Sequence, residues 1–303
     1  MISFEPMDLA RKQEFDKILM NCGDRGCEYS FANLFLWGRQ RAAVIDGFLV
    51  FFNQYDRQSV YMYPVGTGDV RPVLDAILHD AATRDIACRL VCMNREDCIQ
   101  LTTLYPDMFH IHCDRNGFDY VYKIDDLADL KGRKYQKKRN HIHKFRAEYP
   151  DCHVEVLEEK HIPAVRKMVE EWYRERLEEN PYGDFHMEQV AMDRALRCWK
   201  ELGMEGILLM NGDEILAMTM GTPLSETNFD VNFEKAKANA EGAYAVINQE
   251  FARYLRNKYP ALQFLNREDD MGLEGLRKAK ESYCPDHMVE QYWACLMEDS
   301  CGE

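Results

Sequence analysis

The chain of 303 residues lacks the signals of several common protein classes. No run reaches the roughly 18 apolar residues that a transmembrane helix needs. The N-terminal stretch contains acidic residues and no apolar core, unlike a signal peptide, so we expect a cytoplasmic protein. Long glycine- or serine-rich linkers are also absent. With 46% apolar and 12% aromatic residues, the sequence predicts one large folded domain or two smaller ones.

Cysteine is not scarce, but its usual patterns are missing. The eleven cysteines are scattered along the chain and form no Cys-x-x-Cys pair. A zinc ribbon or a thioredoxin-type redox site is therefore not indicated. We expect reduced thiols in the core and on the surface, and we predict no metal site and no bound cofactor.

Positive charge is scarce overall, yet it is concentrated in one place. The chain has 38 basic and 52 acidic residues, for a net charge of -14, and eight of the basic residues fall within residues 131–146 with no acid among them. Such a segment attracts polyanions to one site on a molecule that repels them elsewhere. This favours binding of a localised anionic group over coating of nucleic acid along its length.

Two interpretations of this basic segment stay open. Apolar side chains at Tyr135, Ile142 and Phe145 share one helical face, and Pro150 ends the helix. The exposed cations would then bind phosphates, and the candidate substrate-binding residues are Lys134, Lys137, Lys138 and Arg139. The alternative is a solvated helix whose cations face the acidic remainder of the protein.

The order of the predicted elements indicates an α/β (α+β) fold built from two domains. The second half reads as strand 152–157, helices 159–179 and 186–202, strands 206–210, 214–224 and 226–233, helix 242–259, strand 262–266, helix 272–282 and strand 287–297. This is the order of a Gcn5-related (GNAT-like) acyltransferase domain, and the first half has a looser version of it. We predict tandem GNAT-like domains, each a mixed, mostly antiparallel sheet flanked by helices. The expected bounds are 1–130, a basic linking helix at 131–150, and 151–303 with the active site.

The stretch 233–251 is the first candidate site. The strand at 226–233 is expected to separate from its neighbour, and the next helix would begin at Gly242, where its free N–H groups face an anion or an acyl carbonyl. Glu234 and Lys235 would end the strand there as a base and as a cation near the ester oxygen. Asn232 and Tyr244 are further substrate-binding candidates. Tight helix packing is the alternative explanation for Gly242.

The stretch 265–285 is the second candidate site. A strand runs into the polar residues Asn266, Arg267 and Asp270 at the kind of strand end where α/β domains form sites. Gly272 and Gly275 lie in or near the next helix, where glycine is unfavourable, so we expect a neighbouring helix or a ligand to approach the backbone. Arg277 adds a cation. We assign catalysis to Glu234, Lys235, Arg267 and Asp270, and substrate binding to Asn266 and Arg277.

These segments, KGRKYQKKRNHIHKF, FEKAKANAEGAYAVINQEF and LNREDDMGLEGLRKAKESYCP, together resemble the DUF2156 family. The chain is similar from about Ile2 to Met297 to the C-terminal soluble domain of phosphatidylglycerol lysyltransferases. The resemblance implies tandem GNAT-like domains akin to Fem-type aminoacyltransferases, which move an aminoacyl group from tRNA to a lipid or peptidoglycan amine or hydroxyl. The transmembrane half of the lysyltransferases is not part of this sequence.

Three functions remain in competition. The first is transfer of an aminoacyl group from the tRNA acceptor stem to a lipid headgroup, a peptidoglycan precursor or a small molecule. The second is acyl-CoA-dependent N-acylation, although the glycine loop typical of CoA binding is reduced here to one glycine. The third is a non-catalytic module that binds an anionic partner through the basic segment.

Overall fold

The computed structural model describes residues 1–23, 25–38, 40–55, 58–179 and 185–297. The chain divides into two compact units. Unit 1 consists of residues 1–119, 269–274 and 288–303, and unit 2 consists of residues 120–268 and 275–287. This division differs from the expected one, because the basic segment lies inside unit 2 and two C-terminal segments belong to unit 1.

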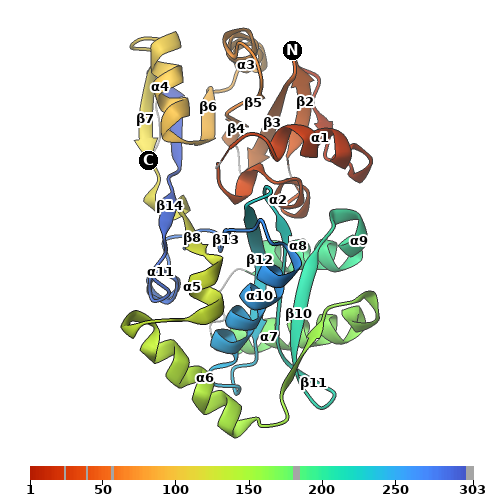
Figure 1. The fold of residues 1–303 in the computed structure, drawn as a ribbon. Coiled ribbons are helices and arrows are strands. Elements are labelled where there is room, and N and C mark those ends of the chain that lie inside the picture. The colour runs from red at the N-terminus through yellow and green to blue at the C-terminus, as the bar shows by residue number, and fades with distance from the viewer. Residues whose placement is uncertain (24, 39, 56–57, 180–184, 298–303) are drawn as a thin grey trace. The chain divides into compact units, whose positions relative to one another are not determined.

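Unit 1 is built on a mixed sheet with strand order β1-β2-β3-β4-β6-β15-β7, and β5 pairs with β3 (Figure 1). Only β4 and β6 pair in parallel among the pairings of this sheet given by the described residues. Its elements are β1 (Glu5–Pro6), α1 (Lys12–Leu19), α2 (Phe31–Leu36), β2 (Arg41–Ile45), β3 (Phe48–Tyr55), β4 (Gln58–Met62), β5 (Val65–Gly66), α3 (Arg71–Arg84), β6 (Arg89–Met93), α4 (Arg95–Leu104), β7 (Phe109–Cys113) and β15 (Tyr292–Leu296).

Local sequence signals explain much of unit 1. Asp46 and Gly47 join β2 to β3 with φ values of 49° and 82°, as a tight two-residue hairpin turn requires. The Asn94 side chain caps α4 by accepting a hydrogen bond from the Asp97 backbone N–H at 2.9 Å. The Asp97 side chain in turn accepts a hydrogen bond from the Asn94 backbone N–H. Apolar side chains of α3, including Val73 and Ile77, are buried against the strands. Both the hairpin and the capped helix follow from local sequence.

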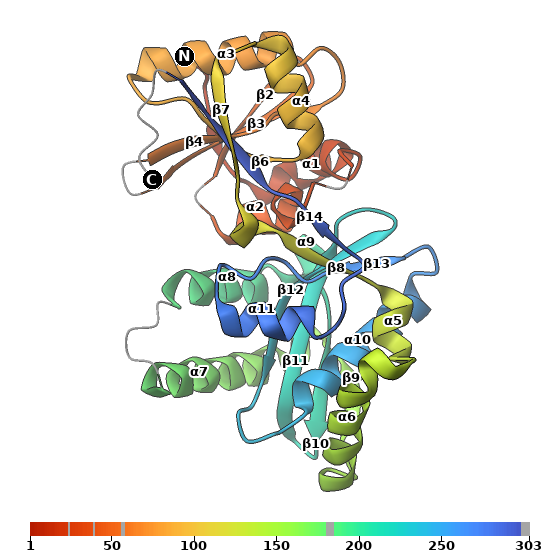
Figure 2. The ribbon, with the colours of Figure 1, turned by 90° about the vertical axis from the view of Figure 1, so that its left-hand side faces the viewer.

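Unit 2 is built on a second mixed sheet, with strand order β14-β8-β13-β12-β11-β10-β9. Helix α10, with α5 and α6 beside it, covers one face of this sheet, and α7 and α8 cover the other (Figures 1 and 2). The elements are β8 (Asp119–Lys123), α5 (Ile124–Asp129), α6 (Gln136–Glu148), β9 (His153–Val156), α7 (Ile162–Glu179), α8 (His186–Arg197), α9 (Trp199–Leu202), β10 (Glu205–Asn211), β11 (Glu214–Pro223), β12 (Asn228–Ala236), α10 (Ala243–Lys258), β13 (Phe264–Asn266), α11 (Glu274–Glu281) and β14 (His287–Val289).

The basic segment folds largely as predicted. A short 3-10 helix at Arg133–Tyr135 leads into α6. The side chains of Tyr135, Ile142 and Phe145 are buried, so the expected apolar stripe is confirmed. The helix ends before Pro150.

Three predicted elements differ from the structure. The expected helix 186–202 is interrupted at Cys198 and forms α8 and α9. The expected last strand 287–297 forms β14 and β15, which belong to different sheets. Strand β12 continues to Ala236, so Glu234 and Lys235 lie inside the strand and not at its end. Apolar pattern alone does not mark such interruptions and extensions.

The centre of unit 2 contains an irregular strand pair. The register between β11 and β12 shifts between Met220 and Thr222. A Cβ on Gly221 would lie 1.8 Å from the carbonyl oxygen of Asp230, so only glycine fits this close approach. On its other side, β12 pairs in parallel with β13 over three residues only, from Asn228 to Asp230. The following residues of β12 therefore have no β13 neighbour, which gives the strand separation expected for this fold.

Within the described part of the chain, no helix combines the length and the apolar character needed to cross a lipid bilayer. Thiols not engaged in a disulfide occur at Cys92, Cys98, Cys113, Cys152, Cys198 and Cys284.

Candidate functional site

An ion pair lies where β12 and β13 separate. Arg267 directly follows β13, and its Nη2 lies 2.8 Å from Oε1 of Glu234 on β12. The side chains are only 14% and 10% exposed. Both residues were predicted as catalytic, and the structure brings them together in unit 2. An ion pair so removed from water needs all its polar atoms satisfied to be stable.

Contacts within the protein do not satisfy all the polar atoms of this ion pair. Nη1 of Arg267 and Oε2 of Glu234 are buried and have no hydrogen-bond partner. The hydroxyl of Thr219, which pairs with Glu234 across β11 and β12, is also buried and unpartnered. Side chains directly opposite in an antiparallel pair share one face. Sequence reasoning missed Thr219 because it lies between Met218 and Met220 in an apolar stretch of β11.

Aromatic rings and one lysine surround the ion pair. The Arg267 guanidinium lies 4.9 Å from the ring centre of Tyr283 and 5.8 Å from that of Tyr122. Lys138 of α6 places its ammonium 3.6 Å from the centre of the Tyr283 ring. Burial, reinforced by the nearby Arg267, lowers the pKa of Lys138 to about 8. A fraction of this amine is therefore neutral near neutral pH, which suits proton transfer.

A second contact holds the basic segment beside this cluster. The hydroxyl of Tyr135 lies 3.1 Å from the carbonyl oxygen of Tyr283 and 3.3 Å from Oδ2 of Asp126. Tyr135 is fully buried. The position of Lys138 over Tyr283 is thus fixed by α6 packing and not by a flexible loop.

Lys235 points to a different group of residues. Its ammonium lies 2.6 Å from Oε1 of Glu188 on α8 and 3.8 Å from the ring centre of Trp172 on α7. The Lys235 side chain is 7% exposed, and burial lowers its pKa against the opposing effect of Glu188. Since adjacent strand residues face opposite sides, Lys235 and Glu234 serve separate clusters. The catalytic role of Lys235 stays a prediction, and the structure places this residue in a cluster separate from Glu234 and Arg267.

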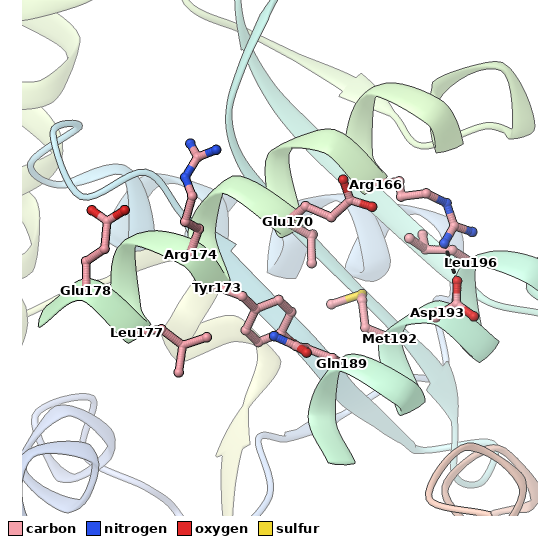
Figure 3. A pocket seen from close by; sticks show the side chains of 11 residues that line it. Arg166, Glu170, Tyr173, Arg174, Leu177, Glu178, Gln189, Met192, Asp193 and Leu196 are labelled. Atoms are coloured by element: carbon pink, nitrogen blue, oxygen red, sulfur yellow. Dashed lines mark hydrogen bonds and ion pairs between the residues drawn. The ribbon is translucent and has the colours of Figure 1, made fainter. Parts of the chain in front are cut away.

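A cavity in the described part of unit 2 lies between α7 and α8 and has a volume of about 590 Å³ (Figure 3). Tyr173, Leu177 and Met192 line its apolar part, and an ion pair between Arg166 and Asp193 lies at its rim. Tyr173 also contacts Lys235, with 5.3 Å between the ammonium and the ring centre. The cavity therefore adjoins the Lys235 cluster.

The cations of the basic segment are mostly engaged within unit 2. Three pair with acids at 3.0 Å or less, namely Lys131 with Asp129, Lys134 with Asp126, and Arg146 with Glu250, and Lys144 pairs with Glu241. Arg139 donates to the backbone carbonyls of Leu130 and Gly132. Among the described residues of this segment, Arg133, Lys137 and Lys138 have neither an acidic partner nor a hydrogen bond to a backbone carbonyl. Pairing with acids thus accounts for four cations and hydrogen bonding to the backbone for one, and phosphate binding is left to three.

The space beside Gly242, where an anion or an acyl carbonyl was expected, is filled by a neighbouring helix. Gly242 precedes α10 with φ 93°, and a Cβ there would lie 2.8 Å from the carbonyl oxygen of His141 on α6. The close approach therefore comes from a neighbouring helix, as the alternative explanation held. Tyr244 in the first turn of α10 is 39% exposed and remains available for contact.

Other predicted substrate-binding residues have structural partners. Asn232 donates to Asp230 at 2.7 Å inside the sheet, and Asn266 accepts from the Glu268 backbone at 2.7 Å. Arg277 lies partly buried on α11. Asn232 and Asn266 are fully buried, so both shape the strand separation from within.

Asp270, predicted as catalytic, belongs to unit 1. It is fully buried, lies 3.3 Å from Arg115 and accepts from the Gly272 backbone at 2.9 Å. Gly272 has φ 73° and lies against Asn116, whereas a Cβ on Gly275 would meet open space. The expected close approach is thus found at Gly272 and not at Gly275.

One group of described residues could hold a metal ion. Ligand atoms of Cys27, Glu28 and Asp119 in unit 1 lie within 4.8 Å of one another. Asp119 also accepts a hydrogen bond from the Cys27 backbone at 2.7 Å, so the group is held together by its own hydrogen bonds. The sequence had predicted no metal site. This group belongs to unit 1, whereas Glu234 and Arg267 belong to unit 2.

Comparison with solved structures defines the class of protein. A tandem GNAT protein from the clavulanic acid biosynthesis pathway matches with a TM-score of 0.51 at 8% identity, covering 99% of this chain and 100% of that chain. The predicted fold, tandem GNAT-like domains with mixed sheets, is therefore confirmed. More narrowly, the family described as phosphatidylglycerol lysyltransferase, C-terminal, matches residues 21–295. The chain belongs to this family.

Two further structures cover nearly the whole chain. A conserved protein of unknown function from Bacteroides thetaiotaomicron VPI-5482 is 37% identical, with a TM-score of 0.92, covering 98% of this chain and 100% of that chain. L-PGS from Bacillus licheniformis is 17% identical, with a TM-score of 0.70, covering 98% and 94%.

A curated relative, the uncharacterized protein MYCGA3080 of Mycoplasmoides gallisepticum, is 23% identical over 179 residues. The match spans 57% of this chain and 54% of the relative, about half the length of each.

Proposed function

We propose that this protein transfers an aminoacyl group from aminoacyl-tRNA to an amine or hydroxyl acceptor. The observation that carries the proposal is the buried Glu234–Arg267 pair, which keeps an unused donor and an unused acceptor beside the low-pKa amine of Lys138. Membership of the lysyltransferase family gives this arrangement its chemical context. The acceptor classes considered are lipid headgroups, peptidoglycan precursors and small molecules.

The proposed chemistry is an ester aminolysis or transesterification. The acceptor nitrogen or oxygen forms a bond to the ester carbonyl carbon, and the bond from that carbon to the ribose oxygen breaks. Neutral Lys138 takes the proton that the acceptor loses and, as an ammonium, gives it to the departing ribose oxygen. Arg267 stabilises the negative charge that develops on the carbonyl oxygen, and Glu234 holds Arg267 in place.

The basic segment supplies the proposed contact with tRNA. Arg133 and Lys137 are exposed, lie within one turn or two of Lys138, and have no acidic partner among the described residues. Phosphate contacts by such side chains would place the acceptor end near the Lys138 amine. The acyl-CoA alternative gains no support at Gly242, since α6 occupies the space beside it.

The proposal is tested by turnover. The protein is incubated with bulk tRNA charged with labelled amino acids and a panel of acceptors: phosphatidylglycerol vesicles, peptidoglycan precursors and soluble amines. We expect label to leave tRNA for one acceptor, and Arg267→Gln to slow this by about 100-fold or more, while Lys167→Gln at an exposed position of α7 leaves it unchanged. Consumption of acetyl-CoA without any transfer from tRNA would overturn the proposal.

A further inference from the structure

We propose that the site recognises donors that carry a free α-ammonium group. In this inference, which rests on the proposed function, Oε2 of Glu234 and the Thr219 hydroxyl accept hydrogen bonds from the ammonium. Nη1 of Arg267 donates to the neighbouring ester carbonyl. The consequence is selection for aminoacyl-tRNA against donors whose α-nitrogen is acylated.

The first observation is that these three atoms are all buried and all lack a partner. Thr219 and Glu234 are opposite each other in the β11–β12 register, and Glu234 contacts Arg267 directly. The unused atoms are thus gathered at one point of the sheet. Buried polar atoms without partners are rare in folded proteins and each one needs an explanation.

The second observation concerns the geometry of the ion pair. Glu234 and Arg267 are joined through Oε1 and Nη2 alone at 2.8 Å, although both groups can pair through two bonds. The single bond leaves one acceptor of Glu234 and one donor of Arg267 without a partner. An α-aminoacyl ester offers the complementary groups, an ammonium and a carbonyl oxygen on adjacent carbon atoms. The Thr219 hydroxyl supplies a second acceptor for the three ammonium hydrogens.

The third observation concerns access. The three atoms are closed to solvent, so a ligand reaches them only if a neighbouring side chain moves. Lys138 can do so, because it lies on α6, is only partly buried and has no hydrogen-bond partner among the described residues. Its ammonium rests on the Tyr283 ring next to Arg267. A shift of the Lys138 side chain on its helix would open this route while leaving the amine beside the ester for proton transfer.

The test compares two donors that differ only at the α-nitrogen. Bulk charged tRNA is divided, and one half is N-acetylated so that the α-nitrogen loses its charge and two hydrogen-bond donors. Affinities of both halves and of uncharged tRNA are measured for wild type, Thr219→Val, Thr219→Ser and Glu234→Gln. We expect wild type to bind the free-amine form at least about tenfold more tightly than the acetylated form.

The variants separate recognition from folding. Thr219→Val and Glu234→Gln should reduce this preference toward one, whereas Thr219→Ser, which keeps the hydroxyl, should retain it. Uncharged tRNA should bind all four proteins alike, which reports that each is folded. Equal affinity of wild type for free and acetylated donors overturns this inference alone. Failure to bind any tRNA overturns the proposed function and this inference with it.

Discussion

At the scale of single residues, Lys138 has the most unusual environment of the basic segment. Its ammonium contacts an aromatic face and lies near Arg267, and burial with that neighbouring charge lowers its pKa to about 8. Lys144 on the same helix is exposed and paired with Glu241, which raises its pKa. Two lysines of one helix thus have opposite properties because only one is withdrawn from water.

This environment predicts a pH dependence of transfer. The active form of Lys138 is the neutral amine, whose fraction rises as pH increases through about 8. We expect the enzyme-dependent rate to rise about tenfold per pH unit below that value and to level off above it. The measurement is the initial transfer rate from pH 6 to 9.5, after subtraction of spontaneous ester hydrolysis. A Lys138→Met variant that kept the same profile would contradict the assignment.

The buried pair of Lys235 and Glu188 gives a second prediction. Lys235→Met leaves Glu188 without its cation, and because Glu188 is 29% exposed and can be partly hydrated, we expect a loss of about 2–3 kcal/mol of stability. Urea unfolding measures the loss, and Lys235→Met with Glu188→Leu should recover part of it. Unchanged stability together with abolished transfer would instead place Lys235 in contact with substrate.

Sequence reasoning located some site residues and missed others for physical reasons. Glu234 and Arg267 were found because charged residues beside buried strands are unusual. Thr219 was missed because a single hydroxyl in an apolar strand is compatible with any packed sheet. The partners of Arg139 could not be predicted, because the carbonyls of Leu130 and Gly132 are brought to it only by the turn that follows α5.

At the scale of elements, the contact between α6 and α10 depends on one glycine. Gly242 has a positive φ and lies against the His141 carbonyl oxygen. We expect Gly242→Ala to destabilise the protein by about 2 kcal/mol, since a Cβ adds both backbone strain and a clash.

Gly275 provides a matched control for this prediction. It lies in α11, and a Cβ there meets open space, so Gly275→Ala should stabilise the helix by up to about 1 kcal/mol. The free energies of unfolding of both variants in urea test the contrast. Equal effects of the two substitutions would show that the α6–α10 contact does not depend on Gly242.

Elements with a strong local signal were predicted well, and those set by distant partners were not. The hairpin at Asp46–Gly47 follows from turn chemistry alone. The division of residues 287–297 into β14 and β15 depends on which sheet each strand joins. β15 pairs with β6 and β7, almost 200 residues earlier in the chain, and no local pattern encodes that choice.

At the scale of the whole molecule, the charge distribution and the fold both favour the proposed aminoacyl transfer. The chain has a net charge of -14, and acids of α5, of α10 and of the turn before α10 pair with four of the eight cations of the basic segment. Of the cations that no acid pairs, Lys138 lies on the Tyr283 ring that Arg267 also contacts. The predicted fold is confirmed at this scale by the match to a tandem GNAT protein over 99% of the chain.

The most direct test of the account is tRNA binding by two double variants with the same change in charge. Arg133→Gln/Lys137→Gln removes unpaired cations, and Lys144→Gln/Arg146→Gln removes paired ones. We measure affinity for bulk aminoacylated tRNA at several salt concentrations, with CoA and acetyl-CoA alongside.

We expect wild type to bind tRNA with an affinity that falls as salt rises. The first double variant should bind more weakly, with the slope of log affinity against log salt reduced by about 1.5. The second should remain close to wild type, and neither CoA nor acetyl-CoA should bind. Binding of CoA without binding of tRNA, or identical behaviour of the two double variants, would contradict the account.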